Sequence, residues 1–155
     1  TVVEGAEEFQ VAVEGQKIVL GNKEYKTTIW RAVDQGAQTV GWTFIITGAG
    51  FADRIELVAG VDGRFEKMTG YDVLYANETP GFGDKIYGEF FKDQFKGAPA
   101  GRFELIKMGS AEEKDEQIVA ITGATVTSEA MVSAISAHME QVRQALVKKG
   151  LLDGE

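Results

Sequence analysis

Residues 118–150 read IVAITGATVTSEAMVSAISAHMEQVRQALVKKG, and this stretch holds the strongest structural pattern in the chain. Its first four residues, 118–121, are apolar and predict a short strand. Lys148 and Lys149, followed by Gly150, mark the end of a helix. Before that end, apolar residues recur at the spacing of one helical face: Met131, Val132, Ile135, Met139, Val142, Ala145 and Leu146. The stretch therefore predicts a strand, a hydroxyl-rich connection and a long amphipathic helix.

The first half of the chain contains short apolar runs separated by glycine-containing turns. Residues 17–20 and 25–33 flank Gly21-Asn22-Lys23 and predict a hairpin, and residues 40–47 (VGWTFIIT) predict a buried strand. Residues 55–61 and 64–75 predict the clearest hairpin, because they flank Asp62-Gly63, a dipeptide that favours a tight turn with positive φ at both central residues.

The pattern changes after Pro80. Asp84 as N-cap and Gly97 as the end predict a second helix, whose apolar residues are Phe82, Ile86, Phe90, Phe91 and Phe95. Residues 103–108 predict a strand, and residues 110–117 (SAEEKDEQ) predict a charged loop. Strands joined by hairpins, with helices after them, indicate an α+β fold: an antiparallel sheet with helices packed on it. Without repeats or linkers, residues 1–155 are expected to form a single domain.

Composition excludes several classes of protein. The chain has 155 residues and a formal net charge of −8, so it offers no surplus of basic residues for nucleic acid. It has no cysteine and one histidine, His138, which excludes disulfides, iron–sulfur clusters and histidine-rich metal sites. We therefore expect neither a metal site nor nucleic-acid binding. Acidic residues are scattered, and no pair of them suggests acid–base catalysis, so no catalytic residue is assigned.

Residues 121–131 (ITGATVTSEAM) are the first candidate binding segment. Thr122, Thr125, Thr127 and Ser128 bring hydroxyls, and Gly123 allows close approach of the backbone. The start of a helix presents unpaired N–H groups and partial positive charge, which suits a phosphate. The alternative is an ordinary helix N-cap, where Ser and Thr are favoured anyway.

Residues 77–86 (NETPGFGDKI) are the second candidate segment. Pro80 stiffens a turn in which Gly81 and Gly83 flank the aromatic Phe82. Such a loop could pack an apolar side chain against a flat ring and offer backbone amides to its edge. The alternative is a loop that only leads into the next helix.

Together, GATVTS before an amphipathic helix and ETPGFG upstream resemble the FMN-binding domain family. The resemblance is to the G subunit of Rnf electron-transport complexes and the C subunit of the sodium-pumping NADH:quinone reductase. It covers roughly residues 30–147. The family's upstream pattern is ETPGLG, so this chain differs there only by Phe82.

The resemblance implies a covalent cofactor. In the family, the last threonine of Ser/Thr-Gly-Ala-Thr carries FMN by a phosphoester bond, and this residue is Thr125 here. A separate Mg-dependent flavin transferase makes that bond from FAD. The residues implied to surround the phosphate are Thr122, Gly123, Ala124 and Thr127, and those implied to border the ring system are Glu78, Thr79, Gly81, Phe82 and Gly83. Lys85 and Ser128 are also counted as cofactor-binding residues. The alternative for each is a simple surface or capping role.

The sequence departs from the family in two places. The transferase pattern has an acidic residue three positions before the Ser/Thr, where this chain has Val119. Family members also carry an N-terminal membrane helix, and no apolar run here approaches the roughly 20 residues that a spanning helix needs. We therefore expect the chain to be the soluble part of a protein anchored at the extracytoplasmic (periplasmic) face of the membrane.

The function that the resemblance implies is electron transfer within a membrane ion-translocating redox complex of Rnf type. The expected partners are the other subunits of that complex and the flavin transferase. The chain alone is expected to catalyse nothing. A redox-sensing or regulatory FMN module of a membrane protein is the alternative, and a domain that has kept the fold without the flavin is a third possibility.

Three other features suggest simpler roles. Residues 48–53 (GAGFAD) match only part of a dinucleotide-binding fingerprint and read as a loop between strands. His138 falls near the apolar face of the last helix and is expected to be a packing residue. Trp30 and Trp42 lie in predicted strands and are expected to be core residues.

Overall fold

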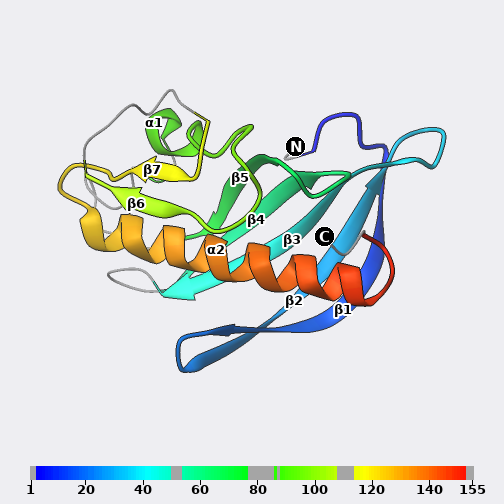
Figure 1. The fold of residues 1–155 in the computed structure, drawn as a ribbon, viewed down its shortest axis with the longest axis horizontal. Helices are drawn as coiled ribbons and strands as arrows, with labels where there is room; N and C mark the ends of the chain where they lie inside the picture. Colours follow the sequence, from blue (N-terminus) through cyan, green and yellow to red (C-terminus); the bar gives the residue numbers. More distant parts are fainter. Residues whose placement is uncertain (1–2, 50–53, 77–85, 87, 108–113, 153–155) are drawn as a thin grey trace.

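A five-stranded antiparallel sheet in the order β1–β2–β3–β4–β5 forms the larger part of the molecule (Figure 1). The computed structural model describes residues 3–49, 54–76, 86, 88–107 and 114–152. Each strand pairs with the next one along the chain. The strands are β1 (Glu8–Leu20), β2 (Lys23–Val33), β3 (Thr39–Ala49), β4 (Arg54–Asp62) and β5 (Met68–Tyr75). The predicted α+β class is confirmed.

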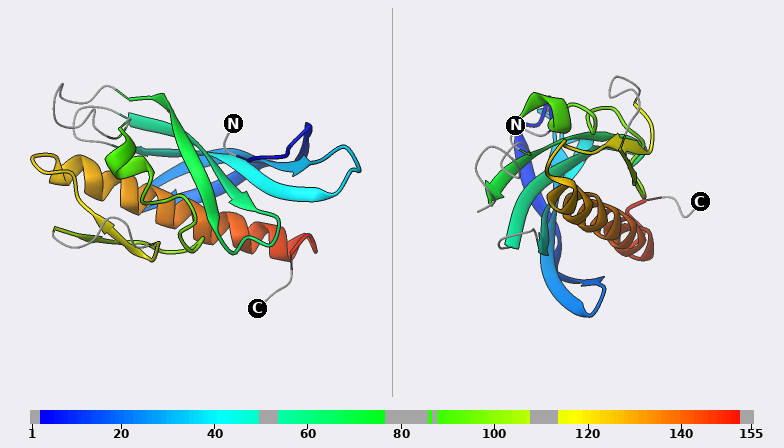
Figure 2. Two further views of the ribbon diagram at one scale, coloured as in Figure 1. Left: turned by 90° about the horizontal axis from the view of Figure 1, so that it is seen from above. Right: turned by 90° about the vertical axis from the view of Figure 1, so that its left-hand side faces the viewer.

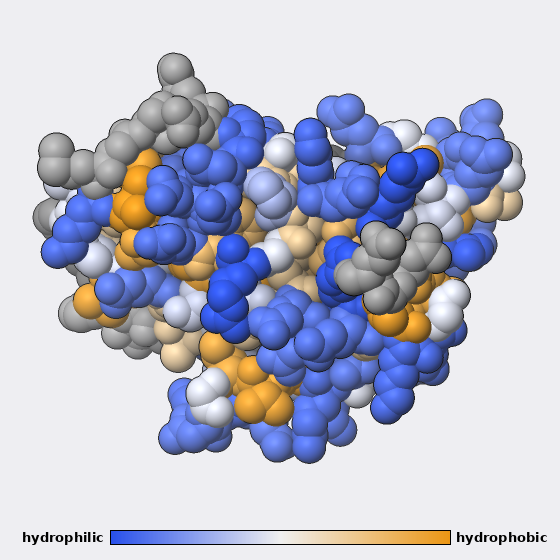
Figure 3. Space-filling model, viewed as in Figure 1, coloured by the Kyte–Doolittle hydropathy of each residue, from blue (hydrophilic) through white to orange (hydrophobic). Residues whose placement is uncertain are grey.

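The predicted C-terminal helix is also confirmed, as α2 (Thr125–Lys148). It lies between the five-stranded sheet and a small second sheet (Figure 2). All residues of its predicted apolar face are buried except Ala145, which is half-buried. Gly150 has φ of +76°, and Leu151 N–H donates to Leu146 O, which is the Schellman arrangement at a helix end. The outward face of α2 is largely hydrophilic (Figure 3).

Close packing of α2 on the sheet depends on a glycine. A Cβ atom placed on Gly48 of β3 would lie 2.7 Å from the Cβ atom of Ala134 on α2. Real Cβ atoms do not come that close, so helix and strand could not keep this spacing with any larger residue. Gly48 therefore belongs to a helix–sheet contact, and residues 48 and 49 of the segment expected to be a loop form the end of β3.

The second sheet consists of β6 (Glu104–Ile106) and β7 (Gln117–Val119), which pair in parallel. Both strands were predicted, over 103–108 and 118–121, and both are shorter than predicted. The charged loop predicted over 110–117 falls partly outside the described residues, and its last residue, Gln117, already belongs to β7.

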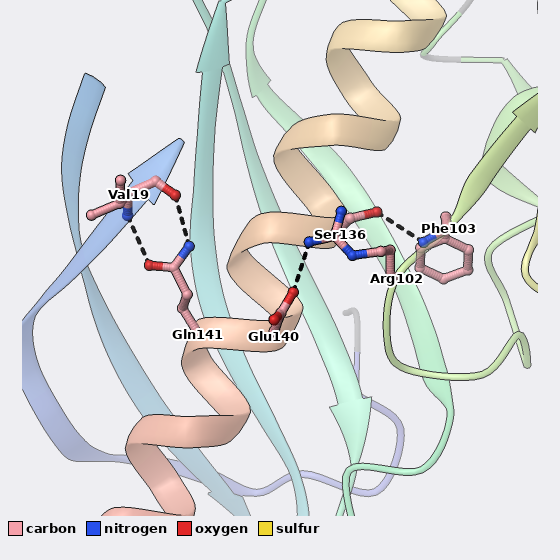
Figure 4. A network of polar contacts seen from close by, with 6 residues as sticks. All are labelled: Val19, Arg102, Phe103, Ser136, Glu140 and Gln141. Atoms are coloured by element: carbon pink, nitrogen blue, oxygen red, sulfur yellow. Dashed lines mark hydrogen bonds and ion pairs between the residues drawn. The ribbon is translucent and has the colours of Figure 1, made fainter. Parts of the chain in front are cut away.

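β1 is much longer than the run of 17–20 predicted for it. It is an edge strand, and its register with β2 shifts between Val11 and Val13 and again between Val13 and Gln16. These irregularities and the exposed charged residues along it break the alternating apolar pattern by which a strand is recognised. Near the end of β1, the side chain of Gln141 on α2 forms hydrogen bonds with the backbone of Val19 (Figure 4).

The predicted hairpin of β4 and β5 is confirmed, but the tight turn predicted for it at Asp62-Gly63 is wrong. Asp62 ends β4, and a wider loop follows, in which Phe65 and not Gly63 has positive φ, at +58°. The Asp62 carbonyl accepts the Phe65 N–H at 3.1 Å, and its carboxylate accepts the Glu66 N–H at 2.7 Å. Phe65 is fully buried and stacks on Phe44, with ring centroids 6.2 Å apart. Burying this ring requires more chain than a two-residue turn provides.

The helix predicted from Asp84 to Gly97 is observed only as α1 (Glu89–Lys92). After Lys92 the backbone continues in tight turns, and Gly97 N–H donates to Met68 O of β5. Phe95 makes edge contacts with the rings of Tyr71, Phe91 and Phe103, at centroid distances of 5.5, 5.4 and 5.2 Å. Bonds to β5 and this aromatic cluster therefore override the local helical pattern. Asp84, the predicted N-cap, lies outside the described residues.

Neither helix within the described ranges has the length and apolar character needed to cross a membrane.

Candidate functional site

The connection between β7 and α2 contains a turn that requires glycine. Ala124 N–H donates to Ile121 O at 3.0 Å, which closes a four-residue turn. Gly123, its third residue, has φ of +81°, as in a type II turn. Thr122 and Gly123 are exposed. The turn brings the chain to the surface immediately before the helix begins.

The first backbone amides of α2 are not capped by a side chain. The N-cap residue is Ala124, with φ of −137° and ψ of 44°, and it makes no side-chain capping bond. The first intrahelical bond runs from Ser128 N–H to Ala124 O at 3.0 Å. Within the described part of the chain, the N–H groups of Thr125 and Val126 have no protein acceptor. The ordinary N-cap interpretation of this hydroxyl-rich segment therefore does not account for it.

The charge around these amides suits an anion. The first turn of α2 contains no acidic residue, and the first acid along the helix is the exposed Glu129. The 24-residue helix directs the positive end of its dipole toward this point. The start of α2 thus combines the positive end of the helix dipole with a first turn free of carboxylates, an arrangement that suits a phosphate.

The four hydroxyls of the segment divide into two groups. Thr122 is exposed and Thr125 is half-buried, next to Val126, which is 53% exposed. Thr127 and Ser128 are buried. The Ser128 hydroxyl accepts the Ile121 N–H at 3.0 Å and donates to Ala124 O at 2.8 Å, so it braces the turn from inside. Thr125, the residue expected to carry the cofactor, is therefore neither fully exposed nor buried.

Gln94 is a residue of this region that the sequence analysis missed. It is 1% exposed, and its side-chain amide bonds both backbone groups of Val119. Val119 itself is buried at the end of β7, at the position where the transferase pattern has an acidic residue. Its burial could not be read from the sequence, but once buried a side-chain amide must find partners.

The second candidate segment lies outside the described residues except for its last residue, Ile86. The predicted cofactor residues Glu78, Thr79, Gly81, Phe82, Gly83 and Lys85 are all in the part that is not described. Ile86 is fully buried, and its carbonyl accepts a bond from the Tyr71 hydroxyl at 2.8 Å. Burial raises the pKa of Tyr71 well above its usual value, and the Asp72 carboxylate adds to that, so the hydroxyl remains a donor at neutral pH.

His138 has the structural role expected of it. It is fully buried, its Nε2 accepts the Thr47 N–H at 3.3 Å, and its Nδ1–H donates to Ala134 O at 2.8 Å. Trp42 is a core residue whose indole N–H donates to Gly63 O, whereas Trp30 is half-buried. No cluster of three metal-ligating residues occurs within the described ranges. A hollow of about 630 Å³ lies between α2, the end of β1 and Arg102, and none of the predicted cofactor residues that the structure describes lines it.

Comparison with known proteins identifies the domain type. The model of the FMN-binding domain matches residues 50–140. The chain is 33% identical over 113 residues to the G subunit of an ion-translocating oxidoreductase complex from Methanosarcina acetivorans, covering 73% of this chain and 57% of the relative. It is 36% identical over 115 residues to the G subunit of the Na(+)-translocating ferredoxin:NAD(+) oxidoreductase complex from Acetobacterium woodii, covering 72% and 53%. The chain thus spans little more than half the length of these relatives.

Two solved structures share the fold. NqrC from Shewanella oneidensis superposes with a TM-score of 0.70 at 21% identity, covering 87% of this chain and 66% of that one. The C subunit of the Na(+)-translocating NADH-quinone reductase from Parabacteroides distasonis gives a TM-score of 0.64 at 20% identity, covering 97% and 79%.

Proposed function

Because this chain belongs to the FMN-binding domain family, we propose that it is an electron-transfer domain carrying FMN on Thr125 through a phosphoester bond. The observation that supports this site best is the start of α2. There the half-buried Thr125 follows a turn with Gly123 at φ of +81°, and no side chain caps the helix. A bare turn with open amides suits a phosphate that must approach the backbone closely.

The residues present fit the phosphate end of FMN. The amides of Thr125 and Val126 would donate to phosphate oxygens, and the exposed Thr122 hydroxyl would border the group. No carboxylate in the first turn opposes the phosphate charge. Thr127 and Ser128 would support the turn from the buried side. Bound FMN supplies the redox chemistry, and the protein supplies its placement and electrostatic surroundings.

The covalent bond would form by transfer from FAD. The Thr125 hydroxyl oxygen bonds to the phosphorus on the FMN side of the pyrophosphate, and the bond from that phosphorus to the bridging oxygen breaks. AMP leaves with that oxygen, and the hydroxyl proton passes to a base of the flavin transferase. The chain needs no catalytic group for this step, because it is the acceptor and the transferase with Mg²⁺ is the catalyst.

The wider setting follows from the relatives. They are subunits of ion-translocating oxidoreductase complexes, so we place this chain in such a complex, with electrons passing between its FMN and neighbouring subunits. In the same proposal residues 1–155 form one domain at the extracytoplasmic face of a membrane. Glu78, Thr79, Gly81, Phe82, Gly83 and Lys85 would border the ring system.

The attachment can be tested by co-expression of the chain with a matched flavin transferase in medium that contains Mg²⁺. The denatured wild-type chain should fluoresce on a gel and show the mass of one added FMN. Thr125→Ala should show neither, whereas Thr122→Ala should keep the adduct. An adduct on the Thr125→Ala variant would move the site elsewhere, and an unlabelled wild-type chain would overturn the proposal.

A further inference from the structure

The side chain of Gln94 closes the open edge of β7. Parallel pairing with β6 uses the groups on one side of β7, as in the bond from Ala120 N–H to Ile106 O at 2.8 Å. Because backbone groups alternate in direction along a strand, Val119 points its N–H and C=O away from β6. Gln94 Oε1 accepts that N–H at 2.7 Å, and Gln94 Nε2 donates to that C=O at 3.0 Å. A single buried side chain thus takes the place of a neighbouring strand.

This contact is the first of several bonds that hold the chain between Val119 and Ala124, the residue before Thr125. After Val119, Ala120 N–H is held by Ile106 O, and Ile121 N–H is held by the Ser128 hydroxyl. Ile121 O then accepts the Ala124 N–H that closes the turn. The backbone is therefore held at each of these positions up to the residue before Thr125. A shift of Val119 would be passed on to the turn.

The same side chain also connects this region to α1. Gln94 Nε2 donates to Phe90 O at 3.3 Å, and the neighbouring Asp93 carbonyl accepts a bond from Lys114, on the segment that leads into β7. The turns after α1 and the strand before α2 are thus joined by hydrogen bonds of the Gln94 side chain and by the hydrogen bond from Lys114. Gln94 therefore links the α1 region to the strand that leads into the turn before Thr125.

From this arrangement we infer that Gln94 is a positioning residue for attachment of FMN at Thr125. The inference rests on the proposed function. Its physical basis is that transfer to a hydroxyl requires the oxygen to lie in line with the bond that breaks, and small displacements slow such reactions strongly. Gln94 does not touch the reacting atoms. It holds the strand from which the turn and Thr125 are presented.

The chain contains a matched control. Gln141 makes the same pair of bonds with Val19, at 2.8 Å from the Val19 N–H and 2.7 Å to the Val19 C=O, but on β1 and far along α2 from Thr125. Gln94→Met and Gln141→Met each remove one such pair and keep the length of the side chain. The Gln141 pair is exposed and the Gln94 pair is buried, so Gln141→Met controls for the loss of an amide clamp as such but not for its burial.

The experiment measures the initial rate of FMN labelling by the flavin transferase, with FAD and Mg²⁺ saturating, at a series of concentrations of the chain. Gln94→Met should lower the turnover rate by about tenfold to a hundredfold, the loss expected for a misplaced reacting group, with KM for the chain within about twofold. Gln141→Met should leave both constants within about twofold of wild type. Partial unfolding alone would dilute the competent chain, so it would raise the apparent KM and leave the turnover rate unchanged.

The outcomes are distinct. An unchanged turnover rate in Gln94→Met, or a rise in KM alone, overturns the positioning role. The proposed function still stands in that case, provided that wild type is labelled and Thr125→Ala is not. Failure to label wild type overturns both. If Gln94→Met does not fold, Gln94→Glu decides by the same readings, because its carboxylate can accept the Val119 N–H but cannot donate to the Val119 carbonyl. A reduced turnover rate there supports the role, and a normal rate rejects it.

Discussion

Gln141 on α2 and Val19 on β1 are joined by two hydrogen bonds, although 122 positions separate them in the chain. The amide group of Gln141 pairs with both backbone groups of Val19 as a neighbouring strand would (Figure 4). β1 is an edge strand, and Val19 is 46% exposed. The clamp therefore satisfies backbone groups that could otherwise recruit another strand.

Gln141→Met should lower the free energy of unfolding by about 1–2 kcal/mol, because two hydrogen bonds in a partly exposed place are lost. Urea unfolding monitored by circular dichroism measures this change. The variant should also associate more readily at high concentration, which light scattering detects. Gln144→Met, an exposed neighbour on the same helix, should change neither quantity. Equal stability of the two variants would show that the clamp contributes nothing.

Stability should depend on pH through the only histidine of the chain, His138. Burial lowers its pKa from 6.5 to about 4, and its bond to Ala134 O offsets this only in part. Between these values the unfolded chain binds a proton and the folded chain does not. The contribution of His138 to the free energy of unfolding is therefore fully present above pH 6.5. It is lost as the pH falls toward 4, which lowers the free energy of unfolding by roughly 3 kcal/mol over this interval.

This pH effect can be separated from that of the carboxylates. Unfolding by urea at several pH values between 7 and 4.5 should give a steeper loss for wild type than for His138→Gln, which cannot titrate. The ring signal of the only histidine in NMR spectra reports its pKa directly. A pKa near the ordinary value of about 6.5 would contradict the burial argument.

Gly48→Ala should destabilise the fold by about 1–3 kcal/mol, the usual cost of overpacking a well-packed contact. The added methyl would lie 2.7 Å from the Cβ atom of Ala134, so α2 would have to move away from β3. Gly101→Ala is the control, since nothing lies within 4 Å of the added atom there. Thermal unfolding of the two variants side by side measures the difference. Similar melting temperatures would mean that α2 adjusts without cost.

Gly123→Ala should slow FMN labelling more than it reduces stability. Forcing a side chain to φ of +81° costs about 1 kcal/mol, and the turn that presents Thr125 would distort to relieve it. Gly150→Ala carries a similar strain, at φ of +76°, at the opposite end of the same helix. Both variants should lose comparable stability in urea, but only Gly123→Ala should be labelled slowly. Equal labelling rates of Gly123→Ala and Gly150→Ala would show that the turn does not contribute to the presentation of Thr125.

Prediction from sequence succeeded where the decisive interactions are local. The face of α2, its end at Gly150 and the strands of residues 25–33 and 40–47 follow from periodicity and from single residues with special backbone preferences. The hydroxyl-rich connection before α2 was also placed correctly, although the turn that residues 121–124 close within it was not predicted. The amphipathic pattern of residues 86–95 was equally clear, yet the helix there is four residues long, because packing around Phe95 and bonds to β5 decide it.

By itself, then, the sequence determined the class of fold, the long helix and the position of the hydroxyl-rich turn at its start. Only the tertiary structure decided how far these residues are buried, with Thr122 exposed, Thr125 half-buried and Ser128 bonded inside. It also decided what holds that turn in place. Gln94 and Val119 lie 25 positions apart, and no local pattern brings them together. Buried polar groups find their partners across the chain only once the strands and helices have packed.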